Sequence, residues 1–218
     1  MNFKVYQPTA NALYDTCCNE AGMLNNTSYS HHMNSHHMNF FYTGSVQQVY
    51  LPSTRQDVIV ITMVAGGGCG GETHIQSNIQ FSGGGGGGGG SIVSVPVNIG
   101  NLSSFSLYVG KGGGALGEDG EDSYIQIGST LYSVTGGKAA ILNTRGDHGD
   151  GVIDGTDGMH GEMATPSSPV VQGGLGGSSF LGNAQLPGYG SGGKGMDVNS
   201  STVNPGTSGV VMITYYSN

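Results

Sequence analysis

The chain has 218 residues, of which 43 are glycine and only 9% are charged. This length suits one domain with an extension, and so low a charge argues against ordinary intrinsic disorder. A formal net charge of −8 with six Lys plus Arg argues against binding of nucleic acid, and the lack of any run of about 18 apolar residues argues against membrane insertion.

Residues 1–45 contain few glycines and many Asn, His and Met residues. We predict that they form an N-terminal docking arm. Within this arm a short helix is expected to begin after Thr9, which would cap it, and to reach about Leu24. Met1 is not followed by an apolar h-region, so no secretory signal is expected.

A small repeat in this arm places His32 and His36 four residues apart. In a helix the two imidazoles would share one face and could bind a metal ion together. In a strand they would lie about 13 Å apart, which is too far for one ion. No acidic residue stands nearby as a further ligand or orienting partner. His32 and His36 are therefore weak metal candidates, a polar and pH-sensitive contact arm is preferred, and no cofactor is expected.

From residue 46 to 218 the pattern predicts a second domain, which is all-β. Alternating apolar residues are typical of strands, Pro96 favours an edge or the end of a strand, and Gly128-Ser129 is typical of a two-residue hairpin loop. The predicted strands are 46–51, 55–64, 93–99, 105–109, 124–127, 130–134 and 209–216.

Eight consecutive glycines stand between two of these strands, and shorter glycine runs recur along the domain. Polyglycine can be a flexible linker. It can also form extended three-fold helices, with a rise of about 3.1 Å per residue, that pack side by side because no side chain keeps them apart. The strongly apolar flanks favour ordered packing. The predicted structural core is Gly83, Gly84, Gly85, Gly86, Gly87, Gly88, Gly89 and Gly90.

Residues 141–205 have the weakest strand pattern and include a turn-rich acidic stretch. Asp-Gly pairs make turns, and their spacing here matches neither an EF-hand nor a regular calcium-binding repeat, so solvated surface loops are favoured over a calcium site. We predict that these loops contact a partner. The candidate residues are Asp147, His148, Asp150, Asp154, Asp157 and the aromatic Tyr189.

The chain has no pattern typical of an enzyme. Gly192-Gly193-Lys194 and Gly136-Gly137-Lys138 lack the Ser or Thr and the helix that a phosphate-binding loop needs. Asp147, His148 and Asp150 come without a nucleophile or an implied pocket. The cysteines, Cys17, Cys18 and Cys69, match neither a disulfide framework nor a metal motif and are expected to be inert.

The order of the parts is distinctive. A long strand and glycine block at residues 58–71 precede Val-Gly-x-Gly-Gly-Gly at 109–114, Gly-x-Asp-Ser at 120–123, x-Gly-Gly-Lys at 135–138 and a closing Gly-Val-Val-x-Ile-x-Tyr strand at 209–215. This order resembles the glycine-rich domain of phage tail-fibre and adhesin proteins, which is also found in structural proteins of large eukaryotic DNA viruses. The resemblance spans roughly residues 46–217.

The resemblance implies a β-sandwich-like shell around packed polyglycine-II-type segments, with loops exposed at one end. It implies a virion protein, most simply a tail-fibre or spike attachment module that contacts a host glycan or protein. The alternative is a minor capsid or scaffold protein. In either version the arm would dock onto other virion proteins, and homo-oligomers are compatible with the sequence. An ice-binding or cell-surface glycine-rich protein is a remote alternative.

Overall fold

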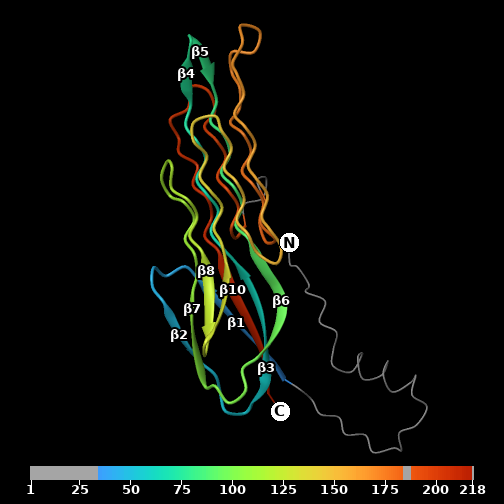
Figure 1. Ribbon diagram of the computed structural model, residues 1–218. Coiled ribbons are helices and arrows are strands. Elements are labelled where there is room, and N and C mark those ends of the chain that lie inside the picture. Colours follow the sequence, from blue (N-terminus) through green and yellow to red (C-terminus); the bar gives the residue numbers. More distant parts are fainter. Residues whose placement is uncertain (1–33, 184–187, 218) are drawn as a thin grey trace, which may run out of the picture.

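The computed structural model of the chain describes residues 34–183 and 188–217 (Figure 1). These residues form ten β-strands and no helix, which confirms the all-β prediction. The strands are β1 (Asn34–Phe41), β2 (Gln47–Tyr50), β3 (Arg55–Val64), β4 (His74–Gln76), β5 (Ile79–Phe81), β6 (Ser91–Asn98), β7 (Ser104–Tyr108), β8 (Ser123–Ile127), β9 (Thr130–Val134) and β10 (Val210–Ser217).

Eight of the strands form two antiparallel sheets, in the orders β1-β10-β3-β6 and β2-β7-β8-β9, and β4 pairs with β5 alone. Apolar side chains from both four-stranded sheets meet in one hydrophobic core. Ile59, Ile61 and Ile213 come from one sheet, and Leu107 and Ile125 come from the other; all are fully buried. The two sheets are therefore arranged in a sandwich-like way around their shared core.

The strand predictions agree well with these sheets. β3 has the predicted bounds, and its buried residues alternate from Ile59 onward. Pro96 lies on β6, which is an edge strand, where the missing proline N–H removes no hydrogen bond from the sheet. Gly128 has a φ of 58° in the loop between β8 and β9, as the two-residue hairpin requires.

The β4–β5 hairpin is absent from the predicted strands. Its loop residues, Ser77 and Asn78, both have positive φ, at 52° and 63°. Two such residues give a loop whose twist matches that of the flanking strands. Because the loop contains no glycine and each strand has only three residues, the sequence gives little indication of a hairpin here.

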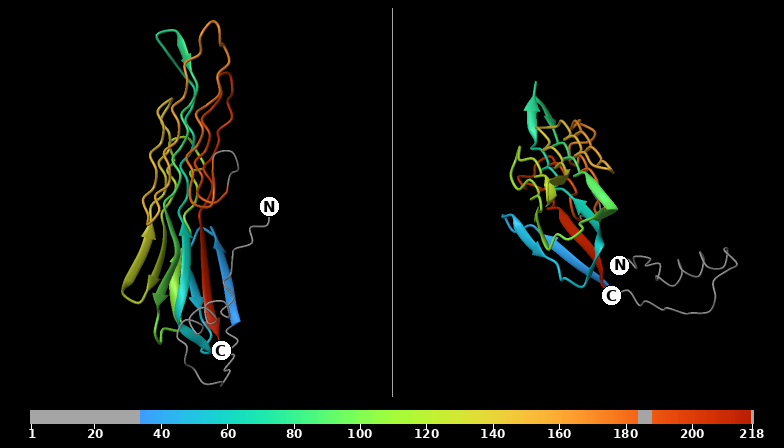
Figure 2. Two further views of the ribbon diagram at one scale, coloured as in Figure 1. Left: turned by 90° about the vertical axis from the view of Figure 1, so that its right-hand side faces the viewer. Right: turned by 60° about the horizontal axis from the view of Figure 1, so that its bottom comes forward.

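The glycine-rich segments extend beyond one end of the two sheets, where the chain runs back and forth in long, nearly parallel passes (Figures 1 and 2). The expectation of a β shell around the glycines is therefore wrong in its geometry. The space between the sheets is filled by apolar side chains, whereas β3, β6, β9 and β10 continue directly into or out of glycine segments. We call these segments the glycine array; it comprises residues 65–71, 83–90, 109–122, 135–151, 153–162, 171–178, 188–197 and 203–209.

The run Gly83–Gly90 is hydrogen-bonded along its whole length and is not a flexible linker. Its bonds have a period of three residues. The amides of Gly83, Gly86 and Gly89 donate to the carbonyls of Met196, Gly193 and Gly190, at 2.8–2.9 Å. The other amides follow the same period toward residues 153–162 and 135–142.

The carbonyls of the same run accept from three further segments, at residues 65–71, 146–149 and 174–177. Six passes of the chain therefore surround Gly83–Gly90, two of them from residues 135–151, and each contacts it at every third residue. A Cβ atom on Gly86 would lie 2.2 Å from the carbonyl oxygen of Gly68. Only glycine fits here, because the neighbouring atoms belong to backbone and cannot rotate away.

Residues 34–41 fall within the predicted N-terminal arm, yet they form β1 and belong to the β structure. Residues 34–41 pair with β10 over the full length of β1, from Asn34 opposite Ser217 to Phe41 opposite Val210. The cause is tertiary, since β10 is a long apolar strand that needs a partner on each side. The predicted helix near residues 10–24 and His32 lie outside the described residues.

Candidate binding surfaces

The two ends of the described chain lie together at the base of the molecule, where Asn34 pairs with Ser217. The opposite end consists of the β4–β5 hairpin and residues 163–170 (Figure 1). We call these two segments the distal end. The glycine array separates the distal end from the base, so the molecule is long and has two chemically different ends (Figure 2).

The distal end carries four exposed apolar side chains. Ile75 and Val170 are 71% and 67% exposed, whereas Ile79 and Met163 are 38% and 46% exposed. The two segments that carry them are joined: the Ala164 amide donates to the Gln80 carbonyl at 2.8 Å, and Phe81 pairs with Met163 as an isolated bridge. Several exposed apolar side chains on one tip are typical of a contact surface.

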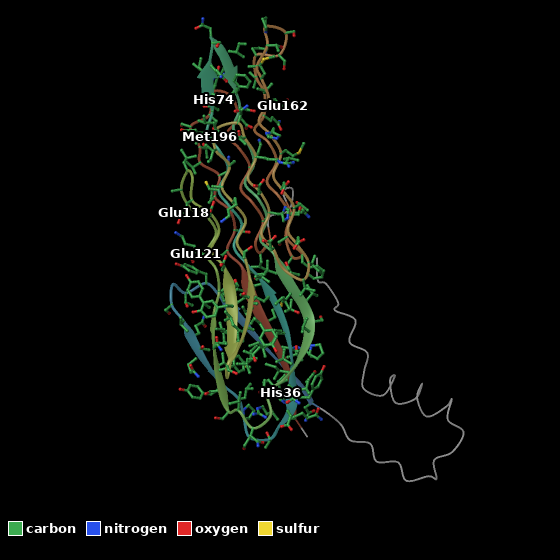
Figure 3. The ribbon with its side chains drawn as sticks, in the orientation of Figure 1. His36, His74, Glu118, Glu121, Glu162 and Met196 are labelled. Carbon is green, nitrogen blue, oxygen red and sulfur yellow. The ribbon has the colours of Figure 1, made fainter. Side chains whose placement is uncertain are left out.

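The backbone of the distal end is fixed from both sides. Thr165 and Ser168 close the 163–170 turn with a pair of backbone hydrogen bonds, each 3.0 Å long. On the facing hairpin, the rings of His74 and Phe81 stack with their centroids 5.0 Å apart. Figure 3 shows His74 and Glu162 close below this tip. Hydrogen bonds and ring stacking therefore fix the backbone that carries the exposed side chains.

The acidic candidates come together on one flank of the array, away from the distal end. Asp157 is the centre of the group: its Oδ1 lies 2.6 Å from Nδ1 of His148 and its Oδ2 lies 2.8 Å from the Arg145 guanidinium. The backbone amide of His148 also donates to Asp157 Oδ1, at 3.0 Å. These contacts tie residues 144–151 to residues 153–162.

The charges in this group shift one another's proton affinity. The hydrogen bond to Asp157 raises the pKa of His148, and the same bond lowers the pKa of Asp157. Asp154 accepts a bond from the Gly151 amide at 3.0 Å, while Asp147 and Asp150 are exposed. In the described part of the chain, no three His, Cys, Asp or Glu side chains gather as metal ligands.

Several acidic side chains supply hydrogen-bond acceptors to glycine-array amides, a role that the sequence analysis did not predict. The pattern repeats at separate places in the array: Asp119 accepts from the Ala139 amide, Asp122 from the Gly136 amide and Asp197 from the Gly173 amide, at 2.8–2.9 Å. A backbone amide with no neighbouring chain to bond needs such an acceptor. Of these three residues only Asp119 stands next to a glycine in the sequence, so no shared local pattern indicates the role.

Glu118 and Glu121 also stabilise the array through hydrogen bonds, within and beside residues 109–122 (Figure 3). Glu118 Oε2 accepts from the Gly114 and Ala115 amides at 2.9 Å, and its other oxygen lies 3.2 Å from Lys111 Nζ. The bond to Lys111 lowers the pKa of Glu118. Glu121 bonds the Tyr108 hydroxyl at 2.5 Å and raises the pKa of that phenol. These carboxylates hold turns and strand ends together.

The remaining candidates lie elsewhere. His36 is on β1 at the base (Figure 3), where its Nε2 lies 2.9 Å from Ser217 Oγ and its ring stacks on Tyr215 at 4.7 Å. His36 lies on a strand, and its predicted partner His32 lies outside the described residues. Tyr189 is separate from the acidic group and contacts Phe41, with ring centroids 5.7 Å apart.

No family model matches the chain, and no curated protein is significantly similar to it. Among residues 34–183 and 188–217, no helix is long and apolar enough to cross a membrane.

Proposed function

We propose that the protein is a virion structural protein, and that it acts as a tail-fibre or spike attachment module which displays its distal end to a host surface. The observation that carries the proposal is the separation of the two ends. The chain enters and leaves the described region at the base, while exposed Ile75 and Val170 lie at the far end. A module anchored at its base would present these side chains outward.

We further propose that the glycine array consists of polyglycine-II-type helices. The three-residue period of the hydrogen bonds around Gly83–Gly90 supports this, because such a helix has three residues per turn and directs successive amides to different neighbours. The proposal predicts φ near −75° and ψ near +145° along the run, within about 20°. An experimental structure that gives ordinary sheet dihedrals there would contradict it.

A scaffold role is the second candidate, and one observation favours it. β1 is an edge strand of the β1-β10-β3-β6 sheet, and an edge strand is where a sheet commonly meets another chain. In this version residues 1–45 and β1 would contact neighbouring virion proteins, and the distal end would contact other parts of the particle.

Competition for adsorption tests the attachment proposal. The full-length protein is added to host cells before the virus that encodes it, and the fraction of adsorbed particles is measured. We expect the wild-type protein to block adsorption, and the double variant Ile75→Ser, Val170→Ser to need at least about tenfold more protein. Val152→Ser is the matched control, because Val152 is 71% exposed but lies on the flank near Ile153, away from the distal end.

Each outcome separates the candidates. Equal blocking by the double variant and the control would show that the distal end is not the contact surface. Binding to disrupted particles without binding to cells would favour the scaffold role. If antibodies against residues 141–205 label no particle, intact or disrupted, the virion proposal is wrong.

A further inference from the structure

A hollow of about 640 Å³ opens where the sheets meet the glycine array. Its walls combine three aromatic residues, Phe41, Tyr42 and Tyr189, with the backbone and hydroxyl groups of Thr207 and Ser208. Small-molecule sites usually have volumes of about 300–1,000 Å³ and a similar mixture of aromatic surface and a few polar groups. Among the residues that the structure describes, none with a charged side chain lines the hollow, so a neutral ligand is expected.

The backbone that carries Tyr189 is fixed. The Gly190 amide donates to the Ser208 carbonyl at 3.0 Å, and the Thr207 amide donates to the Ser191 carbonyl at 2.8 Å. Gly190 has a φ of +73°, and a Cβ there would lie 2.4 Å from the Ala65 carbonyl oxygen. The position therefore requires glycine, and it turns the chain so that Tyr189 stands over the hollow.

Phe41 provides the second ring and is fixed by a different element. It is the last residue of β1, where it pairs with Val210. Phe41 is 50% exposed and Tyr189 is 39% exposed, although an aromatic ring gains by burial. Their ring centroids are 5.7 Å apart with an interplanar angle of 34°, so they form a tilted aromatic pair, which we call the platform. Tyr42 and Ser208 also line the hollow, and the Ser208 hydroxyl accepts from the Gly112 amide at 3.3 Å.

The geometry points to a pyranose ring as the occupant. A pyranose has a face of C–H groups, which packs on the electron-rich face of an aromatic ring, and a rim of hydroxyls, which need donors and acceptors. The platform matches the first requirement, and the hydroxyl-bearing lining residues Tyr42, Thr207 and Ser208 match the second. We propose that this hollow binds a neutral pyranose unit of a glycan, stacked on Tyr189 and Phe41.

A proline-rich peptide would also use aromatic rings, but it fits less well. Such a peptide repeats every three residues, or about 9 Å, and docks between separate aromatic ridges. Here the two rings are in contact and offer one platform. The hollow lies at the junction of the sheets and the array and not at the distal end, so the saccharide assignment adds a second site to the attachment function proposed above. It rests on that function for its biological setting, whereas the binding itself is measured on the purified protein.

The test is saturation-transfer NMR of the full-length protein with maltotetraose, cellotetraose and mannotetraose, followed by titration. We expect at least one to bind with a dissociation constant on the order of 1 mM or tighter. Tyr189→Ala and Phe41→Ala should each weaken binding about tenfold, whereas Tyr189→Phe should retain it because the ring remains. Tyr50→Ala is the control, since Tyr50 is 75% exposed on β2 and does not line the hollow.

The inference is overturned if none of the three sugars binds at about 10 mM. It is also overturned if Tyr189→Ala binds as well as wild type, if Tyr50→Ala weakens binding equally, or if a proline-rich decapeptide binds in place of the sugars. A failure here with intact blocking of adsorption through the distal end would leave the attachment function standing. Saccharide binding without any particle labelling would leave the hollow standing and remove the virion setting.

Discussion

Gly86 and Gly68 contact each other through their backbones, since a Cβ on Gly86 would lie 2.2 Å from the Gly68 carbonyl oxygen. Beside this contact, the Gly68 amide donates to the carbonyl of Gly87, the residue after Gly86, at 2.9 Å. Two segments of the array therefore approach to a distance that excludes any side chain. The same relation repeats at each of the eight glycines of the central run, all of which have backbone atoms of other segments within 3 Å of an added Cβ. The array depends on glycine at these positions.

The first prediction follows from this contact. Gly86→Ala should destabilise the protein by about 3 kcal/mol, the upper end of the usual range for overpacking, because the clash is with backbone and the surrounding segments cannot yield separately. Gly114→Ala is the control: its Cβ would have only ordinary contacts, the nearest at 3.4 Å from Glu118 Oε2. It should be neutral or stabilising by up to about 1 kcal/mol. Urea unfolding of both variants measures the difference, and equal stabilities would contradict the packing.

The second prediction concerns Ser123, which is fully buried. Its hydroxyl accepts from the Gly110 amide at 2.8 Å and donates to the Val64 carbonyl at 2.9 Å, linking the ends of β3 and β8 to the array. Ser123→Ala leaves both groups buried without this partner and should cost about 1–3 kcal/mol. Ser129→Ala, at an exposed loop position, should change stability by less than about 0.5 kcal/mol in the same urea titration.

The third prediction is a dependence of stability on pH. The pKa of His148 is raised above its ordinary value of 6.5, so its contribution is fully present below pH 6.5 and is lost as pH rises through the folded value. The pKa of Asp157 is lowered from 3.8, so its contribution is present above that pH and is lost on further acidification. The pair therefore stabilises the fold most between about pH 4 and 6.5.

His148→Gln should lower Tm more at pH 5.5 than at pH 8.5. His160→Gln, at an exposed position on the adjacent segment, is the control and should change Tm little. Differential scanning calorimetry at the two pH values makes the comparison. A His148→Gln effect that grows with pH would have the wrong sign for the His148–Asp157 bond.

The fourth prediction concerns Cys69, which is fully buried within the array. Burial raises the pKa of its thiol, with a further contribution from the charge of Glu118. Low thiolate content and lack of access should make it at least about a hundredfold slower to react with a disulfide reagent in the native state than in denaturant. The measurement uses a Cys17→Ser, Cys18→Ser variant, so that Cys69 is the remaining thiol. Equal rates would mean that the array opens readily.

The predicted strands were largely confirmed because their residues carry the signal locally. Three signals of this kind are local. The alternation in β7 reflects which face is buried, the glycine in the β8–β9 loop reflects a positive φ, and Pro96 reflects a position that needs no N–H donor. β1 carried no such signal: its Asn and His residues are poor strand formers, and it is a strand because β10 lies beside it. The β4–β5 hairpin likewise depends on two residues with positive φ that the sequence does not mark as a turn.

The candidate site residues were only partly foreseeable. The sequence marks the acidic stretch by its charge alone. The bond between Asp157 and His148, and the role of Asp122 as an amide acceptor, depend on which segments become neighbours. The platform of Tyr189 and Phe41 joins residues 148 positions apart in the chain. No local pattern predicts such a pairing.

The sequence by itself determined that the protein is all-β, where most strands lie, and that the glycine run cannot hold a side-chain core. These are local properties, since alternation, loop residues and the absence of Cβ atoms act over a few positions. Only the tertiary structure decided that the glycine array extends beyond the sheets, which six passes of the chain surround Gly83–Gly90, and which side chains meet at its surface. The physical reason is that a glycine segment has no side chain to identify its partner; its neighbours are selected by the direction and spacing that the adjoining strands impose.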